Sequence, residues 1–206
     1  MIVENRQAHW NDVYLTKGDV GVSWFEPIPT TSLDLIRRLA VPAPASLVDI
    51  GGGASRLVDA LLEDGFDAVT VLDLSAEALE KARRRIGGNA GKVEWVVADV
   101  TQWQPTRSFD IWHDRAAFHF LTETAEQDAY AERLRMTVRP GGHAIIATFA
   151  PDGPDRCSGL PVVRYDPVTL ADAIGASFRL VDERRCLHTT PWGSRQAFQY
   201  SVLERA

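Results

Sequence analysis

The stretch LVDIGGGASRL, residues 47–57, decides the fold expected for this chain. An apolar run opens it, three glycines interrupt it, and apolar residues at helical spacing follow from Leu57 to Leu61. This order predicts a strand, a tight turn and the start of a helix. Gly51 and Gly53 can adopt backbone angles closed to other residues, and they leave room for a ligand against the main chain. The unpaired N–H groups at the start of such a helix favour a nucleotide-like ligand with polar or anionic groups.

Three acidic residues accompany three successive apolar runs, each of which is predicted to be a strand. Asp49 lies in the first run, Asp73 ends residues 68–73, and Asp99 ends residues 93–99. Because the carboxyl ends of neighbouring parallel strands face one crevice, we expect the three carboxylates to surround a single pocket. An acid about 20 residues after the glycine turn can accept hydrogen bonds from the ribose hydroxyls of a nucleotide. For any one of these acids, a helix cap or a turn is the alternative.

These motifs resemble those of the class I S-adenosylmethionine-dependent methyltransferases, and the resemblance extends over nearly the whole chain. The matching segments are Val-Asp-Ile-Gly-Gly-Gly, Val-Leu-Asp-Leu-Ser and Val-Ala-Asp-Val. In that family the first motif holds the methionine part of the cofactor, the second acid holds the ribose and the third reads the adenine. The resemblance therefore implies S-adenosyl-L-methionine as cofactor. The cofactor contacts that it implies are Trp24, Asp49, Gly51, Gly53, Asp73, Leu74, Ser75, Asp99 and Val100.

The N-terminal segment, residues 1–40, is expected to form a helical and aromatic lid. Residues 4–16 carry apolar residues at helical spacing, and residues 22–27 form an aromatic loop that contains Trp24 and Phe25. A helix followed by Trp-Phe is similar to the protein lysine methyltransferases of this class, in which the aromatic segment lies over the cofactor. Simple packing into the core is the alternative for the two aromatics.

The remaining elements predict one α/β domain over residues 1–206 with a doubly wound, Rossmann-like sheet. Strands alternate with helices, which favours seven mostly parallel strands with helices on both faces. Residues 178–188 and 196–203 alternate apolar and polar side chains, and this pattern predicts a final antiparallel pair. Local signals predict a helix over 54–63, a helix cap at Thr30 or Thr31, caps at Ser75 and Asp166, and a turn at 139–142 before a strand.

The end of the fourth predicted strand carries His113, Asp114 and Arg115, which we expect beside the pocket as the wall facing the methyl acceptor. A protonated amine must lose a proton before it is methylated, and His113 or Asp114 is the predicted catalytic base. The alternative is an ion pair that braces the loop. A long loop, residues 150–164, leaves the fifth strand beside the pocket and is a candidate lid, with Cys157 as a small filler residue.

Composition excludes several classes of function. The net charge of −6 disfavours binding to a nucleic-acid backbone, and the histidines show no metal-ligand spacing. No apolar run approaches the roughly 18 residues that span a bilayer, and no signal peptide is recognisable. Two cysteines without a C-x-x-C spacing favour a cytoplasmic protein without disulfides.

The function predicted from these features is methyl transfer from S-adenosylmethionine to a protein lysine or to a small-molecule amine or hydroxyl by in-line displacement. The segment after the fourth strand lacks the Asn-Pro-Pro-Tyr-like motif of nucleic-acid amino methylation, and the paired cysteines of arsenic methylation are absent. Two alternatives stay open: an oxidoreductase that binds NAD, and a non-catalytic nucleotide-binding module. Arg56 counts against NAD, because the dinucleotide fingerprint requires a third glycine at that position.

Overall fold

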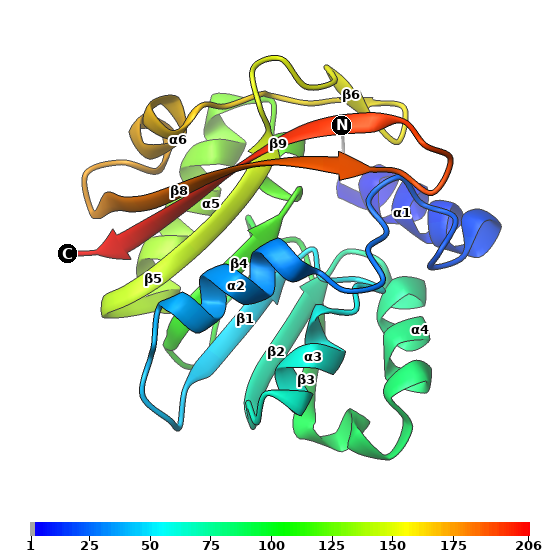
Figure 1. Ribbon diagram of the computed structural model, residues 1–206, viewed down its shortest axis with the longest axis horizontal. Coiled ribbons are helices and arrows are strands. Elements are labelled where there is room, and N and C mark those ends of the chain that lie inside the picture. The colour runs from blue at the N-terminus through cyan, green and yellow to red at the C-terminus, as the bar shows by residue number, and fades with distance from the viewer. Residues whose placement is uncertain (1–2) are drawn as a thin grey trace.

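A computed structural model of the chain describes residues 3–206, and its centre is a single large sheet (Figure 1). The seven strands follow the order β3-β2-β1-β4-β5-β9-β8. The first five are parallel to one another. They are β1 (Ser46–Ile50), β2 (Ala68–Asp73), β3 (Val93–Val97), β4 (Phe109–Arg115) and β5 (Val138–Phe149). The doubly wound α/β sheet predicted from the sequence is confirmed.

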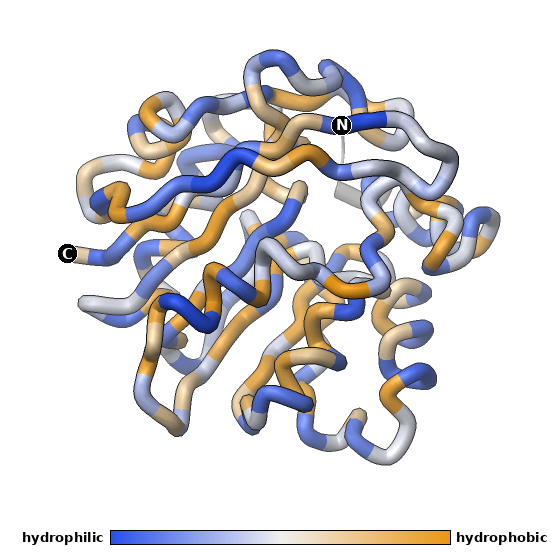
Figure 2. The backbone as a smooth tube through the Cα atoms, in the orientation of Figure 1, coloured by the Kyte–Doolittle hydropathy of each residue, from blue (hydrophilic) through white to orange (hydrophobic). Residues whose placement is uncertain are grey.

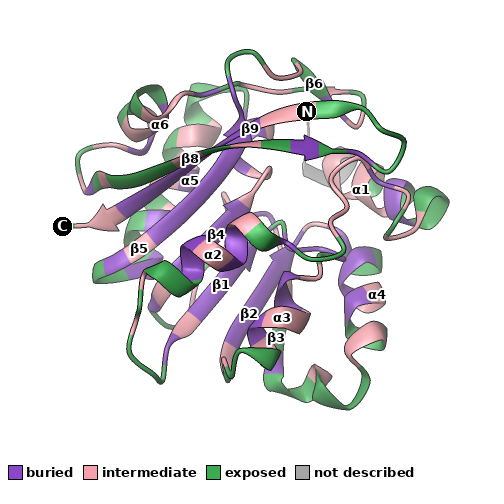
Figure 3. Cartoon of the chain, viewed as in Figure 1, coloured by how far each residue is buried: buried purple, intermediate pink, exposed green. Residues whose placement is uncertain are grey.

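Helices cover both faces of this sheet, because the central strands are apolar on both sides. Leu47 of β1 packs in one hydrophobic cluster and Val48, the next residue, packs in the other, as the alternation of side chains along a strand requires. The central strands are accordingly hydrophobic and buried along their length (Figures 2 and 3). One cluster contains residues of α2 (Thr30–Arg38), α3 (Leu57–Glu63) and α4 (Ala76–Ile86). The opposite cluster contains residues of α5 (Thr124–Thr137) and α6 (Pro167–Ile174).

The chain ends in the predicted antiparallel pair. Strand β9 (Arg195–Arg205) inserts between β5 and β8 (Phe178–Thr189), so β8 forms one edge of the sheet. The pairing of β8 with β9 shifts between Leu180 and Asp182. The long loop expected at 150–164 contains a small hairpin of β6 (Arg156–Cys157) and β7 (Leu160–Pro161).

The N-terminal helix α1 (Val3–Lys17) packs beside α4, near the carboxyl ends of the strands. Two short 3-10 helices complete the described chain, η1 (Gly87–Lys92) after α4 and η2 (Phe118–Phe120) after β4. Within residues 3–206, no helix combines the length and the hydropathy needed to cross a membrane.

Three local expectations are corrected by the structure. The helix predicted from residue 54 begins only at Leu57, because the preceding residues form a turn in which the Ser55 N–H donates to the Gly52 carbonyl. The cap of α2 is Pro29 without a side-chain bond, so neither Thr30 nor Thr31 caps that helix. Residues 139–142 belong to β5, whose pairing with β4 shifts to accommodate them. The side-chain caps predicted at Ser75 and Asp166 are both present.

Candidate functional site

Two adjoining cavities open at the carboxyl ends of the central strands. Cavity A, of about 800 Å³ counted out to the solvent, contains Asp73 and Asp99 in its lining. Cavity B, of about 560 Å³ on the same basis, contains Asp49. Tyr14, Trp24, Ile50, Gly51 and Arg115 line both cavities.

The glycine turn holds the main chain at the junction of the two cavities. Gly51 and Gly53 have φ angles of +63° and +44°, which side chains rarely allow. A Cβ atom at Gly51 would lie 2.8 Å from the Cβ of Ala117, and one at Gly53 would lie 2.8 Å from the Tyr14 hydroxyl. Gly51 lines both cavities, whereas Gly53 lies beneath Tyr14 and lines neither. The bare backbone at Gly51 therefore gives a ligand access to the turn.

Replacing Gly51 with alanine is expected to lower the free energy of unfolding by about 1–2 kcal/mol, the usual cost of placing a residue with a Cβ atom in the left-handed region of backbone conformation. The contact with Ala117 should also displace the turn and weaken binding of S-adenosylmethionine. Gly65→Ala is the matched control, because Gly65 has a φ of +88° with no atom within 4 Å of its added Cβ. Urea denaturation and calorimetric titration measure both effects. Equal behaviour of the two variants in the titration would show that the turn does not require a glycine at position 51.

Asp73 and Asp99 lie on neighbouring strand ends in cavity A, together with Leu74 and Val100. The Ser75 N–H donates to Asp73 Oδ1 at 2.7 Å, and burial raises the pKa of Asp73 to about 7. Asp99 Oδ1 accepts hydrogen bonds from the backbone and side chain of Thr101. Its other oxygen, Oδ2, is buried without a partner among the described residues. Since an unpaired buried acceptor is costly, this oxygen fits a ligand that brings an N–H or O–H donor.

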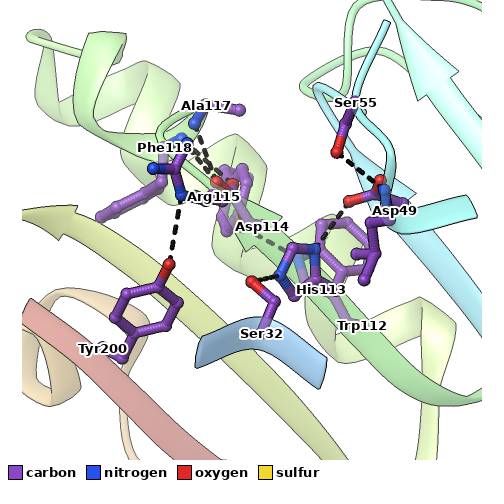
Figure 4. A network of polar contacts seen from close by, with 12 residues as sticks. Ser32, Asp49, Ser55, Trp112, His113, Asp114, Arg115, Ala117, Phe118 and Tyr200 are labelled. Carbon is purple, nitrogen blue, oxygen red and sulfur yellow. Dashed lines mark hydrogen bonds and ion pairs between the residues drawn. The ribbon is translucent and has the colours of Figure 1, made fainter. Parts of the chain in front are cut away.

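Asp49 belongs to cavity B, so the three acids share one edge of the sheet but do not line one pocket. His113 Nδ1 lies 2.7 Å from Asp49 Oδ1, and His113 Nε2 lies 2.9 Å from the Ser32 hydroxyl (Figure 4). The predicted contact Ser75 lines neither cavity. Its hydroxyl caps α4 and bonds to Asn11 of α1 at 2.8 Å.

The expected acceptor wall of His113, Asp114 and Arg115 is divided by the alternation of β4. Asp114 points away from both cavities, where it accepts hydrogen bonds from Ala117 N–H, Phe118 N–H and the Tyr130 hydroxyl (Figure 4). Burial raises the pKa of this carboxyl to about 6. Of the three residues in this expected wall, His113 lines cavity B and Arg115 lines both cavities. The structure thus leaves Asp114 without access to a ligand, and a catalytic role for His113 stays a prediction.

Aromatic residues of the N-terminal segment cover cavity A. Trp10 meets Trp24 at 5.7 Å and Phe120 at 5.0 Å between ring centroids, and Tyr14 meets Trp24 at 6.2 Å. All four side chains line cavity A. The helical spacing of Trp10 and Tyr14 indicated a packing stripe, so their place in the lining was missed. Nothing in the local pattern distinguishes a core stripe from a cavity wall.

Arg6 and Cys157 also line cavity A. Arg6 forms an ion pair with Glu126 of α5. Cys157 is buried, and burial raises the pKa of its thiol to about 11, so it is a neutral thiol at physiological pH. Among residues 3–206, no group of three or more histidine, cysteine and acidic side chains is arranged to hold a metal ion.

Comparison with known proteins relates this chain to methyltransferases. Residues 47–142 match the family described as "Methyltransferase domain". The chain is 32% identical over 120 residues to a trans-aconitate 2-methyltransferase from Rhizobium etli, a match that covers 58% of this chain and 43% of the relative. It is also 32% identical over 128 residues to a trans-aconitate 2-methyltransferase from Acidovorax sp., covering 62% and 46%. The chain thus matches less than half the length of these curated relatives.

Solved structures extend the similarity of fold to the whole chain. A 1,6-didemethyltoxoflavin-N1-methyltransferase from Burkholderia thailandensis, solved with S-adenosylhomocysteine, has a TM-score of 0.75 at 24% identity and covers 100% and 91% of the two chains. A SAM-dependent methyltransferase from Anabaena variabilis has a TM-score of 0.77 at 14% identity and covers 100% and 96%. Residues 47–142 thus match a methyltransferase domain, and the fold of the whole chain is that of solved S-adenosylmethionine-dependent methyltransferases.

Proposed function

We propose that this protein methylates a carboxylate oxygen of a small-molecule acid. The curated relatives are named for trans-aconitate, a small acid, and this supports a small-molecule acceptor. A protein lysine, expected from the resemblance of the N-terminal segment, has no support among these relatives. The observation that carries the proposal is the make-up of cavity A, which combines arginines and aromatic rings and has no base beyond the two aspartates assigned to the adenosine.

The cofactor end of cavity A supports adenosine binding by Asp73 and Asp99. A carboxylate at Asp73 can accept from ribose hydroxyls, and the unpartnered Oδ2 of Asp99 can accept from an amino group of the base. S-adenosylmethionine supplies a methyl group on a cationic sulfur, and its transfer to a carboxylate oxygen breaks the carbon–sulfur bond, leaves the electron pair on sulfur and releases no proton.

The remaining side of cavity A supports binding of a planar anion. The Arg6 side chain is 11% exposed, and its Nε is buried without a hydrogen-bond partner among the described residues. Trp10 and Phe120 line the same cavity and offer flat apolar faces. An acid whose carboxylate accepts hydrogen bonds from Arg6 and whose body lies against these rings would satisfy both features.

The absence of a base favours an acid over an amine. Of the described residues, those that line cavity A include no histidine, lysine or glutamate. The Tyr14 pKa is raised by burial, and the Cys157 thiol is neutral, so neither takes a proton at physiological pH. A carboxylate is already ionised and needs only to be positioned behind the methyl group. A protonated amine would need a base, and the two aspartates of this cavity, Asp73 and Asp99, are assigned to the adenosine instead.

The proposal is tested by incubating the purified protein with methyl-tritiated S-adenosylmethionine and a panel of small acids, each paired with its primary amide. A methyl ester releases its label as volatile methanol in mild alkali. We expect alkali-labile label with at least one acid and none with the amides. Label that survives alkali, or label found only on protein when lysate is supplied, would overturn the proposal.

Replacing Arg6 with alanine is expected to raise the KM for the accepted acid by about 10–100-fold, the value of a hydrogen bond to a charged group. The affinity for S-adenosylmethionine should change by less than about three-fold, because Asp73 and Asp99 stay intact. Glu126→Gln is the matched control, since it removes the ion pair with Arg6 and keeps the guanidinium. Steady-state kinetics on both variants distinguish a loss of acceptor binding, expected for Arg6→Ala alone, from an effect of losing the ion pair, which both variants share. An unchanged KM in Arg6→Ala would contradict the assignment of Arg6.

A further inference from the structure

Residues 22–27, here called the cover segment, lie against the site without belonging to a helix or a strand. Their main chain makes one backbone–backbone hydrogen bond, from the Phe25 N–H to the Val22 carbonyl at 3.2 Å, and none to the rest of residues 3–206. Trp24 of this segment lines both cavity A and cavity B. A ligand in either cavity therefore meets a ring whose position is not fixed by a helix or by a sheet ladder.

Arg115, at the end of β4, binds the cover segment from the sheet. Its Nη1–H donates to the Trp24 carbonyl at 2.9 Å, and its Nη2 lies 3.1 Å from Glu26 Oε1. The guanidinium is itself fixed, because its Nε–H donates to the Tyr200 hydroxyl at 3.1 Å (Figure 4). Its Cζ atom also lies 4.7 Å from the centroid of the Phe198 ring. Since only 11% of this side chain is exposed, Arg115 is a well-positioned anchor for the segment.

His188 of β8 binds the same segment from another strand. Its Nε2 lies 2.7 Å from the Ser23 carbonyl, and because a carbonyl oxygen only accepts, this nitrogen carries a hydrogen and donates. Its Nδ1 lies 3.3 Å from Glu26 Oε1, the same oxygen that meets Arg115. Strands β5 and β9 separate β4 from β8 in the sheet. Two strands that do not touch therefore hold one short segment, and we call Arg115, His188 and Glu26 the clasp.

Glu26 connects the two halves of the clasp through its charge. Burial alone would raise the pKa of Glu26, but the hydrogen bond from His188 and the charge of Arg115 hold this pKa below its ordinary value. The carboxyl is therefore ionised at neutral pH. Its side chain is 19% exposed, so water can replace its partners when the segment moves. Such an ion pair fixes the direction of the closed segment and can also open, whereas apolar packing alone is non-directional.

His188 can influence a ligand only through the cover segment. It lines neither cavity, whereas Arg115 lines both and Glu26 lines cavity B. Its two ring nitrogens contact the Ser23 carbonyl and the Glu26 carboxylate, which flank Trp24 in the chain. Any effect of His188 on ligand binding should therefore depend on the presence of the Trp24 ring.

We propose that His188 and Glu26, together with Arg115, are positioning residues that hold Trp24 closed over the junction of the two cavities, and that opening of this clasp limits the release of S-adenosylhomocysteine. Movement of a covering segment commonly sets the rate of product release in enzymes. The proposal rests on the methyltransferase function, because it takes the demethylated cofactor as the ligand that leaves. It does not depend on which acceptor is methylated.

The test is a double-mutant cycle on the full-length protein, with the dissociation rate of S-adenosylhomocysteine measured by surface plasmon resonance. His188→Ala removes the donor to the Ser23 carbonyl and should raise this rate by about 3–10-fold, the value of one hydrogen bond. In the Trp24→Ala background the same change should alter the rate by less than about two-fold, because the clasp acts through that ring. Thr189→Ala, at the exposed neighbouring position of β8, is the matched control and should leave the rate unchanged.

The cycle distinguishes a clasp from general structural support. An equal rise in both backgrounds would show that His188 supports the site by another route, and this would overturn the proposal, as would an unchanged rate in His188→Ala. If thermal melting shows that His188→Ala does not fold, Glu26→Gln takes its place in the cycle, with the same expected result and the same contradicting ones. Failure of the wild-type protein to bind S-adenosylhomocysteine would overturn the cofactor and the clasp together. Methyl label found on an amine would contradict the acid acceptor alone.

Discussion

Replacing Asp114 with alanine is expected to reduce the free energy of unfolding by about 3–5 kcal/mol, a large part of the about 5–15 kcal/mol that stabilises a typical domain. The carboxylate is fully buried and accepts hydrogen bonds from the Ala117 and Phe118 N–H groups and from the Tyr130 hydroxyl. Alanine leaves all three donors unpaired in the interior, and each costs about 1–3 kcal/mol. Urea denaturation measures the loss.

The matched control is Asp128→Ala, which removes an exposed carboxylate from α5, the helix that carries Tyr130. Equal stability of the two variants would contradict the buried role of Asp114. The pH dependence provides a second check. Because burial raises the pKa of Asp114 to about 6, the native state binds this proton more tightly than the unfolded chain. The proton-linked part of its contribution to stability is thus present at low pH and is lost as pH rises through 6, whereas the hydrogen bonds from the three donors remain above that pH. Asp114→Asn should remove that part of the pH dependence.

Replacing Asp73 with asparagine is expected to weaken binding of S-adenosylmethionine by about 100-fold or more, because two charge-assisted hydrogen bonds to ribose hydroxyls are lost. The wild-type protein should also bind more tightly as pH rises. Burial raises the pKa of free Asp73 to about 7, so below pH 7 the carboxyl is largely protonated and must release its proton before it accepts two hydroxyls.

The expected slope approaches about ten-fold in affinity per pH unit below 7, and affinity levels off above that pH. Calorimetric titration between pH 5.5 and 8.5, in two buffers of different ionisation enthalpy, counts the proton released. Asp99→Asn is the control: it should lose affinity and keep the pH slope, because the slope belongs to Asp73. A wild-type affinity independent of pH would contradict the assignment of Asp73 to the ribose.

The central fold could be predicted because it depends on local patterns. Leu47, Val48 and Ile50 supply apolar side chains to both faces of the first strand, and acids at successive strand ends meet at one edge in any doubly wound sheet. The same rule places a residue along a strand but does not say which face it takes. For this reason Asp114 was expected in the pocket, whereas alternation turns it toward Tyr130.

The parts of the site that the sequence did not reveal depend on distant contacts. Ser32 and His113 are 81 residues apart, and Arg6 and Glu126 are 120 apart, so no local spacing indicates either pair. Arg56 was visible as a departure from the dinucleotide fingerprint, but its lack of a partner is a property of the folded structure. The proposed role of Arg6 therefore depends on what the fold leaves unpaired.

The edge strand β8 has a consequence for behaviour at high concentration. A strand of this length with a free edge is a template on which a second chain can add a strand and begin an aggregate. Arg179, Asp182, Glu183 and Arg185 are exposed along it, and the shift in pairing at Leu180 interrupts its regularity. Charges of both signs must be desolvated before another backbone can dock there. We therefore expect this edge to resist intermolecular strand addition, and neutral replacements at these four positions to make the protein more prone to amyloid-like assembly.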